Sequence, residues 1–155
     1  MVIRLRVPPR IKVLEALGSI ADGRVKVLNE KCANVVSSEG DRVYTVYVDL
    51  DEKVVFSDDN GTKFRGYIGY PIIAFLMIKG VLPFDEKIAK ALKGIPWRKL
   101  NEEYKSYSIV EKIIKDIAKQ RGVDATVLDS FVSNVMNKLS MLSLNYDESK
   151  KCAEF

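Results

Sequence analysis

Residues 42–80 read RVYTVYVDLDEKVVFSDDNGTKFRGYIGYPIIAFLMIKG, and this stretch changes from strand patterning to helix patterning. Side chains alternate along residues 42–50 and both sides carry bulky groups, which predicts a central strand. A turn then leads into a strand at 54–56. Asn60-Gly61 tolerates positive φ and predicts a tight turn into a short strand, 62–65. The helix from Pro71 to Lys79 is apolar on all sides, so we expect it to be the most buried element.

The residues before this stretch predict one helix and two more strands. Pro8 and Pro9 are tolerated in the first turn of a helix, and Gly23 supplies a stop signal, so a helix is expected over 9–21. A strand beginning at Arg24 and another around Val35 then precede the central strand. Together these segments predict an antiparallel β-meander of four to five strands after an N-terminal helix.

The residues after Gly80 predict a helical half. Helices are expected over 84–93, 96–105, 108–121 and 124–142, with Ser108 and Glu111 forming a capping box. The last two helices carry wide apolar stripes, and the short linker at Gly122 predicts an antiparallel helical hairpin. The fold class is therefore α+β, ending in a helical hairpin. We expect a single domain over residues 1–144 and a flexible C-terminal tail over 145–155.

The chain of 155 residues contains no histidine. This excludes an ordinary Cys/His zinc site, a Ser-His-Asp triad and a catalytic histidine, and we expect neither a metal nor a cofactor. The two cysteines, Cys32 and Cys152, lie far apart and outside any CxxC motif, and are predicted to be free thiols. A structural disulfide is the alternative if the source is a hyperthermophilic archaeon. Rich Lys and Glu usage with a single glutamine, Gln120, favours such a thermophilic, archaeal source.

Bulk properties bear on location and partners. No run approaches the roughly 18 apolar residues of a membrane helix, and the N-terminus lacks the layout of a signal peptide. We therefore expect a cytoplasmic protein without a membrane partner. The net charge of +4 and the pI of about 9.0 permit nucleic-acid contact without requiring it.

Two segments combine basic and aromatic residues. The first basic-aromatic segment contains Lys63, Phe64, Arg65, Tyr67 and Tyr70. The second contains Trp97, Arg98, Lys99, Tyr104, Lys105 and Tyr107. Lys and Arg neutralise phosphates while aromatic rings stack on bases, although core aromatics beside a solvated charged face would give the same pattern. Glutamates dilute the second segment, so the predicted nucleic-acid-binding residues are those of the first, on a sheet edge: Lys63, Arg65, Tyr67 and Tyr70. Basic residues near the N-terminus could extend this surface: Arg4, Arg6, Arg10 and Lys12.

Three other groups of residues are of types that occur in functional sites. Acidic residues gather around two predicted turns: Asp49, Asp51, Glu52, Asp58 and Asp59. Clustered carboxylates can hold divalent cations, and Asp51-Glu52-Lys53 fits half of a nuclease motif, but Asp is also favoured in turns. One face of the helix 108–121 is basic: Lys112, Lys115, Lys119 and Arg121. Gly66 and Gly69 precede a helix without forming a phosphate-binding loop.

Within residues 24–80, a strand pair, an Asp/Gly turn and a helix beginning near Gly69-Tyr70-Pro71 follow one another. This order and its hydrophobic rhythm resemble the β-β-α unit of the SWIM domain family, whose zinc site has the form CxC…CxH. The ligand positions fall at Val55, Ser57, Gly69 and Pro71, so every ligand is absent. The resemblance implies a metal-free relative in which apolar packing replaces zinc, and a role in DNA or protein interaction.

The leading hypothesis is a non-enzymatic binding module that contacts nucleic acid or a protein partner through a basic-aromatic sheet edge. A second hypothesis is a metal-dependent phosphodiesterase or nuclease that uses Asp49, Asp51 and Lys53. A third is a structural or regulatory homo-oligomer built on the C-terminal helices.

Overall fold

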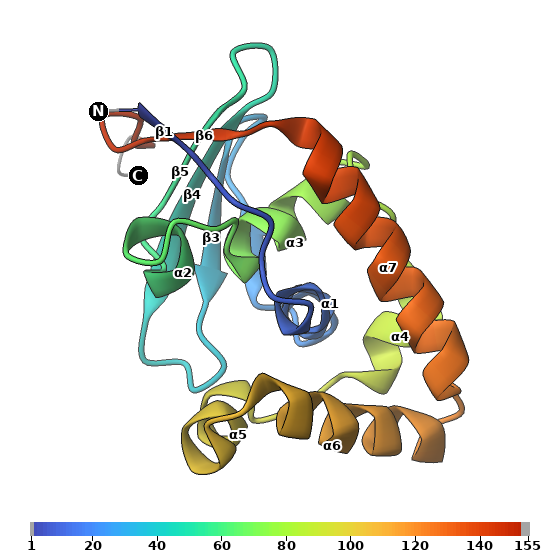
Figure 1. Cartoon of the computed structure of the whole chain (residues 1–155). Coiled ribbons are helices and arrows are strands. Elements are labelled where there is room, and N and C mark those ends of the chain that lie inside the picture. The colour runs from blue at the N-terminus through green and yellow to red at the C-terminus, as the bar shows by residue number, and fades with distance from the viewer. Residues whose placement is uncertain (1, 153–155) are drawn as a thin grey trace.

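The computed structural model describes residues 2–152 and has an α+β fold (Figure 1). Within this range the chain forms seven helices and one six-stranded sheet. In chain order the elements are β1 (Val2–Arg4), α1 (Ile11–Ala21), β2 (Val25–Val27), β3 (Cys32–Val36), β4 (Val43–Asp49), β5 (Val54–Ser57), α2 (Asn60–Lys63), α3 (Tyr70–Ile78), α4 (Glu86–Ala91), α5 (Trp97–Tyr104), α6 (Tyr107–Gln120), α7 (Ala125–Leu142) and β6 (Asn145–Asp147).

The strands lie in the order β1-β6-β5-β4-β3-β2. Strands β2 to β5 form the predicted antiparallel meander, with β4 near its centre. The sheet as a whole is mixed rather than purely antiparallel, because β6 pairs with β5 in parallel, Val55 opposite Tyr146. Strand β1 then pairs antiparallel with β6, Ile3 opposite Tyr146. The two ends of the chain thus complete a sheet that the middle of the chain begins.

The segment from residue 145 was predicted to be a flexible tail, and this prediction was wrong at its start. Asn145–Asp147 is strand β6, and the Asn145 N–H donates to the Lys53 carbonyl at 2.9 Å. Leu144 and Tyr146 are buried. A three-residue strand shows no alternation in the sequence, so only its neighbours in the sheet reveal it.

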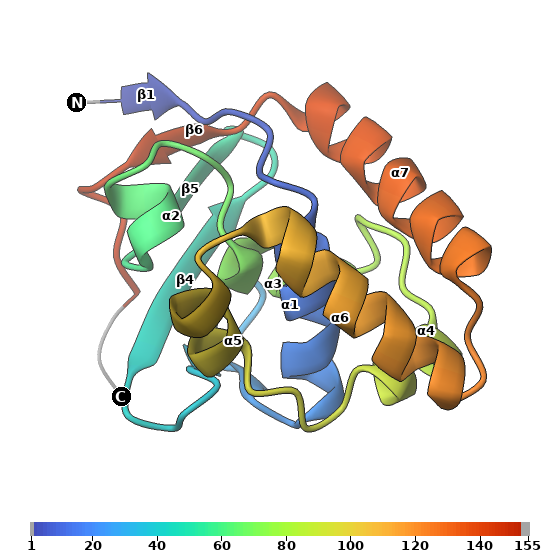
Figure 2. The ribbon, with the colours of Figure 1, turned by 60° about the horizontal axis from the view of Figure 1, so that its bottom comes forward.

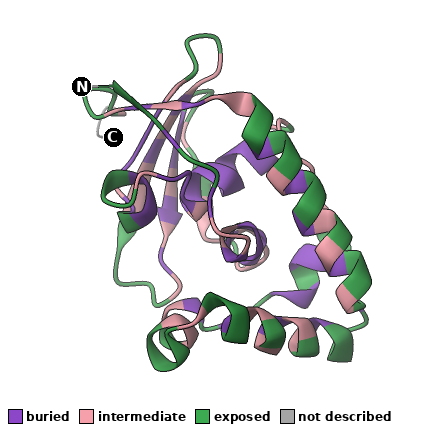
Figure 3. Ribbon diagram, viewed as in Figure 1, coloured by how far each residue is buried: buried purple, intermediate pink, exposed green. Residues whose placement is uncertain are grey.

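Helix α3 packs directly on the sheet, and its residues Pro71–Met77 are all buried, as predicted. Helix α1 packs on α3, and α4 and α7 pack on α1. Burial decreases from the inner to the outer helices: in Figure 3, α1 and α3 are largely buried, whereas α6 and α7 are exposed on their outer sides. The apolar core is therefore continuous from the sheet through α3 and α1 to the outer helices.

Helices α6 and α7 follow one another through the turn at Gly122, but they diverge from it instead of lying side by side as a hairpin (Figures 1 and 2). Their apolar stripes are buried against the rest of the chain: Val110, Ile114 and Ala118 in α6, and Leu128, Val132, Val135 and Leu139 in α7. The N-cap of α6 is Ser106 rather than Ser108, since the Ser106 Oγ accepts from the Ile109 N–H. None of the helices in residues 2–152 combines the length and the apolar character needed to cross a membrane.

The two cysteines were predicted to be free thiols, and this was also wrong. Cys32 in β3 and Cys152 form a disulfide that closes a loop of 120 residues. The chain after β6 turns back across the sheet. Cys152 thereby reaches β3 and β4, which precede it by more than 100 residues in the sequence. Spacing alone could not reveal this pairing because it depends on the path of the last residues.

Removing the disulfide should destabilise the fold, because a cross-link over a long loop restricts the unfolded chain. We expect reduction, or the double substitution Cys32→Ser/Cys152→Ser, to lower the free energy of unfolding by about 2–5 kcal/mol. Guanidinium denaturation with and without reductant measures this difference. The double variant is the control and should not respond to reductant; equal midpoints for the oxidised and reduced wild type would contradict the prediction.

Candidate functional site

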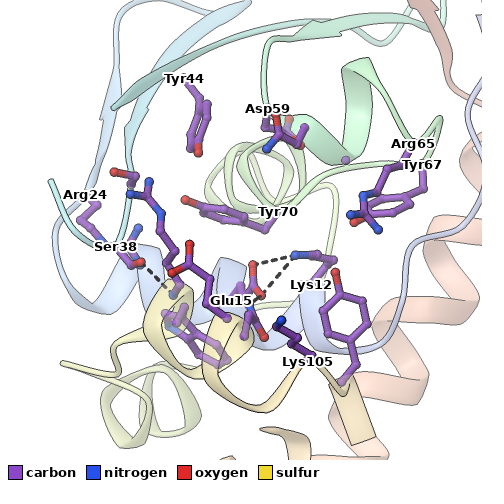
Figure 4. A pocket seen from close by; sticks show the side chains of 18 of the residues that line it. Lys12, Glu15, Arg24, Ser38, Tyr44, Asp59, Arg65, Tyr67, Tyr70 and Lys105 are labelled. Carbon is purple, nitrogen blue, oxygen red and sulfur yellow. Dashed lines mark hydrogen bonds and ion pairs between the residues drawn. The ribbon is translucent and has the colours of Figure 1, made fainter. Parts of the chain in front are cut away.

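The two basic-aromatic segments, which are separate in the sequence, line one pocket. Its volume is about 580 Å³. The first segment contributes Arg65, Tyr67 and Tyr70, and the second contributes Trp97, Arg98, Lys105 and Tyr107. Helix α1, the β3–β4 hairpin and the start of α2 supply the remaining walls, as Figure 4 shows. The two basic-aromatic segments therefore contribute to the same pocket in the folded chain, although they are separate in the sequence.

A buried ion pair on α1 forms part of the pocket lining. The Lys12 Nζ lies 3.1 Å from the Glu15 carboxylate, and the Asn101 Nδ2 donates to the same carboxylate at 2.9 Å. Burial alone would lower the pKa of Lys12. The Glu15 carboxylate, together with Tyr67 and Tyr107, raises it by more, so the net effect is a raised pKa. Lys12 therefore carries a permanent positive charge in the pocket (Figure 4).

Tyrosine rings form another wall of the pocket. Tyr44 and Tyr70 meet edge to face with 6.2 Å between ring centroids, a favourable geometry for two aromatic rings. Tyr67 packs against Gly61, where a side chain would collide with the ring. Burial raises the pKa of Tyr67 and of Tyr70 to about 12 each. Both hydroxyls are therefore neutral at physiological pH and able to donate hydrogen bonds.

Besides the contact of Asn101 with Glu15, helix α5 is held in place at two further points. The Arg98 guanidinium lies 2.8 Å from Asp41 and 3.1 Å from Glu39, both in the β3–β4 hairpin. Trp97 packs into a notch on α1 at Gly18, where a Cβ atom would lie 2.7 Å from the indole nitrogen. The pocket wall carried by α5 is thus attached to both the sheet and α1.

Most of the basic residues around the pocket already have acidic partners. Lys12 and Arg98 are paired as described, and Arg24 lies 3.3 Å from Asp22. Arg65 and Lys105, by contrast, are exposed and have no ion-pair partner within residues 2–152. Lys105 also ends α5 in the left-handed conformation, with φ 50°, which costs a non-glycine residue about 1 kcal/mol. These two cations are the ones free to bind an anion.

A buried hydrogen-bond network holds the segment that carries Arg65 and Tyr67. Asp59 caps α2 by accepting from the Thr62 N–H at 3.1 Å and from the Thr62 hydroxyl at 2.8 Å. The same hydroxyl accepts from the Gly69 N–H at 3.0 Å, and Gly69 lacks the Cβ that would collide with Asp59. Burial raises the pKa of Asp59 although the Ser57 and Thr62 hydrogen bonds oppose it. This capping explains why Asn60-Gly61 begins a helix instead of the predicted turn and strand.

The predicted binding residues are therefore not on a sheet edge but on α2, the loop after it and the start of α3. Lys63 is exposed and does not line the pocket. Of the N-terminal basic residues only Lys12 lines the pocket. Arg4 contacts Asn145, Arg6 donates to the Arg65 carbonyl, and Arg10 pairs with Glu111 and Asp129. Sequence reasoning missed Glu15, Asn101 and Tyr44. For Glu15 a signal existed, since it is a charged residue between apolar positions of a core-facing helix.

Several residues of the other candidate groups have structural partners. Asp49 pairs with Lys31 at 3.2 Å and accepts from the Glu52 N–H, while Asp58 accepts from the Thr45 N–H. In residues 2–152 no three or more acidic or cysteine side chains gather so that they could hold a metal ion. On the basic face of α6, Lys115 pairs with Glu111 and Asp129, and Arg121 donates to carbonyls of residues 91 and 93.

Comparison with known proteins places this site within a family. Residues 5–145 match the family model described as uncharacterised conserved protein UCP014422. The chain belongs to this family. No curated protein and no solved structure matches the chain. Every residue that lines the pocket lies inside the range matched by the UCP014422 model, whereas Cys152 lies outside it.

The resemblance to the SWIM domain was wrong. The UCP014422 model spans nearly the whole chain, including the stretch 24–80 on which the resemblance was based. That stretch forms four strands, α2 and α3, not a β-β-α unit closing a zinc site. The shared hydrophobic rhythm reflects a strand pair followed by a buried helix, which unrelated folds also contain.

Removing the Thr62 hydroxyl should disturb the segment that carries Arg65 and Tyr67. Thr62→Val leaves the buried Gly69 N–H without an acceptor and deprives Asp59 of one donor, so we expect a loss of about 1–3 kcal/mol in unfolding free energy. Urea denaturation measures the loss. Thr45→Val is the matched control, since its hydroxyl makes no hydrogen bond within residues 2–152. Equal losses in the two variants would refute the role of the network.

The attachment of α5 should weaken in acid. Arg98, followed by the Ser37 hydroxyl, holds the pKa of Asp41 down at about 2. Because the folded-state pKa is depressed, the stabilisation is present above pH 4 and is lost as the pH falls toward 2. The gap in unfolding free energy between wild type and Asp41→Asn should therefore shrink from pH 6 to pH 2. Asp51→Asn, on an exposed turn, is the control; a gap that does not depend on pH would contradict the prediction.

Proposed function

We propose that this chain is a non-enzymatic module that binds nucleic acid, and that the pocket receives a base and the phosphates on either side of it from a single strand. The observation that carries this proposal is the convergence of the two basic-aromatic segments on one pocket whose rim holds Arg65 and Lys105 without acidic partners in residues 2–152. Free cations suit phosphate, and the aromatic wall suits a flat base.

The size and chemistry of the pocket support the same ligand. A volume of about 580 Å³ lies within the range of roughly 300–1,000 Å³ that small-molecule sites occupy. Beside the ring wall, the lining offers the neutral hydroxyls of Tyr67 and Tyr70 as donors. The Asn101 Oδ1 is a buried acceptor without a partner among the described residues. The lining thus combines groups for the edge, the face and the phosphate of a nucleotide.

The state of Lys12 favours binding over catalysis. A lysine acts as a nucleophile or base only when its pKa is lowered, and here the neighbouring Glu15 raises it. In the predicted phosphodiesterase site, the Asp49 carboxylate is engaged in a turn hydrogen bond and an ion pair, and Asp51 lies exposed in the same turn. Lys12 therefore offers no neutral amine, and the acidic group offers no cluster of free carboxylates, for a reaction on the strand.

Replacing both free cations should weaken binding and reduce its salt dependence. We expect Arg65→Ala/Lys105→Ala to lower the affinity for a single-stranded oligonucleotide by at least about tenfold at low salt. The negative slope of log K, the binding constant, against log salt concentration should become shallower by about 1.4. Each lost contact with a single-strand phosphate contributes about 0.7. Fluorescence of Trp97, the only tryptophan of the chain, reports occupancy from within the pocket lining.

The matched control is Lys87→Ala/Lys138→Ala, which removes two exposed charges that do not line the pocket. It should leave the affinity nearly unchanged. Equal losses for the two double variants would show a nonspecific effect of net charge, and absence of binding by the wild type at low salt would refute the proposal.

A further inference from the structure

Phe64 is an apolar ring on the surface between two charged neighbours. It is 74% exposed, and Lys63 and Arg65 on either side of it are exposed as well. The Lys63 Nζ lies 5.4 Å from the centroid of the Phe64 ring. Leaving a phenylalanine ring in water forgoes the stabilisation that burial would bring, so the ring contributes little to the fold. The ring is therefore available for contact with a partner.

Phe64 lies in the chain between two residues that line different cavities. Arg65 lines the pocket, whereas Lys63 lines a separate, shallower cavity of about 610 Å³ together with Tyr146 and Lys151. Phe64 therefore belongs to the short segment that separates the two. A ligand that left the pocket past Arg65 toward Lys63 would pass over this segment.

The backbone at Phe64 is held firmly. The Phe64 N–H and the Arg65 N–H both donate to the Asn60 carbonyl, at 2.9 and 3.2 Å. The Arg65 carbonyl accepts from the Arg6 guanidinium, and the Asp59 cap fixes the start of the same helix. A ring presented from a fixed backbone loses little conformational freedom when it binds, which favours it as a contact surface.

We propose that Phe64 is an outer stacking platform for a single strand that continues beyond the pocket. One base stacks on the ring, and Lys63 and Arg65 bind the phosphates before and after it. The alternation of cation, ring and cation matches the alternation of phosphate and base along a strand. This inference rests on the proposed function and adds to it that the ligand is a strand of several nucleotides, not a free mononucleotide.

The test compares Phe64→Ala, Phe64→Trp and Phe64→Leu with wild type. Each is titrated with a mononucleotide and with a single-stranded hexanucleotide, with Trp97 fluorescence or, for Phe64→Trp, the anisotropy of a labelled hexamer as the readout. Phe64→Ala and Phe64→Leu should weaken hexamer binding by about five- to a hundredfold, as loss of a base–aromatic stack does, and Phe64→Trp should keep it. Mononucleotide affinity should stay within about twofold in Phe64→Ala.

The matched control is Phe84→Ala, which removes another partly exposed ring, 42% exposed, that lines neither cavity. Unchanged hexamer binding by Phe64→Ala, while Arg65→Ala/Lys105→Ala loses it, would overturn the stacking platform and leave the proposed function standing. Equal weakening of mononucleotide and hexamer would also overturn it, because Phe64 would then act inside the pocket. Unchanged hexamer binding by the cation variant would instead count against the proposed function itself.

Discussion

The pocket depends on the interactions of one buried carboxylate, that of Glu15. It lies on a helix that is otherwise packed in the core, and it is satisfied by Lys12 from the same helix and Asn101 from α5. An unpaired charge at such a position would cost several kcal/mol, so the three groups must stay together. This requirement holds α5 against α1 and gives the pocket a charged lining beside the apolar core.

Around that centre, the geometry divides the charged residues into two classes. Lys12, Arg24 and Arg98 are held by carboxylates and shape the walls. Arg65 and Lys105 stand on segments whose backbones are fixed by other means, a capped helix in one case and a left-handed helix end in the other. Structural pairing thus uses three of the five cations that line the pocket and leaves Arg65 and Lys105 available to a ligand.

Much of the fold could be predicted because its signals are local. Alternation along β4, the apolar character of α3 and the stop signals of the helices all act over a few residues, and the meander and helical half follow from them. The failures share another cause. Asn60-Gly61 becomes helical because Asp59 and Thr62 meet in the core, β6 exists because β5 and β1 flank it, and the disulfide exists because the chain end returns to β3.

The sequence by itself determined the α+β class, the central meander, the buried helix and the absence of histidine chemistry, and it marked both basic-aromatic segments. Each of these follows from residue types and short-range spacing. Only the tertiary structure decided that the two segments face one pocket, that Glu15 and Asn101 belong to it, and which cations remain unpaired there. The physical reason is that ion pairing and burial depend on contacts between residues far apart in the chain, such as Glu15 with Asn101 and Asp41 with Arg98.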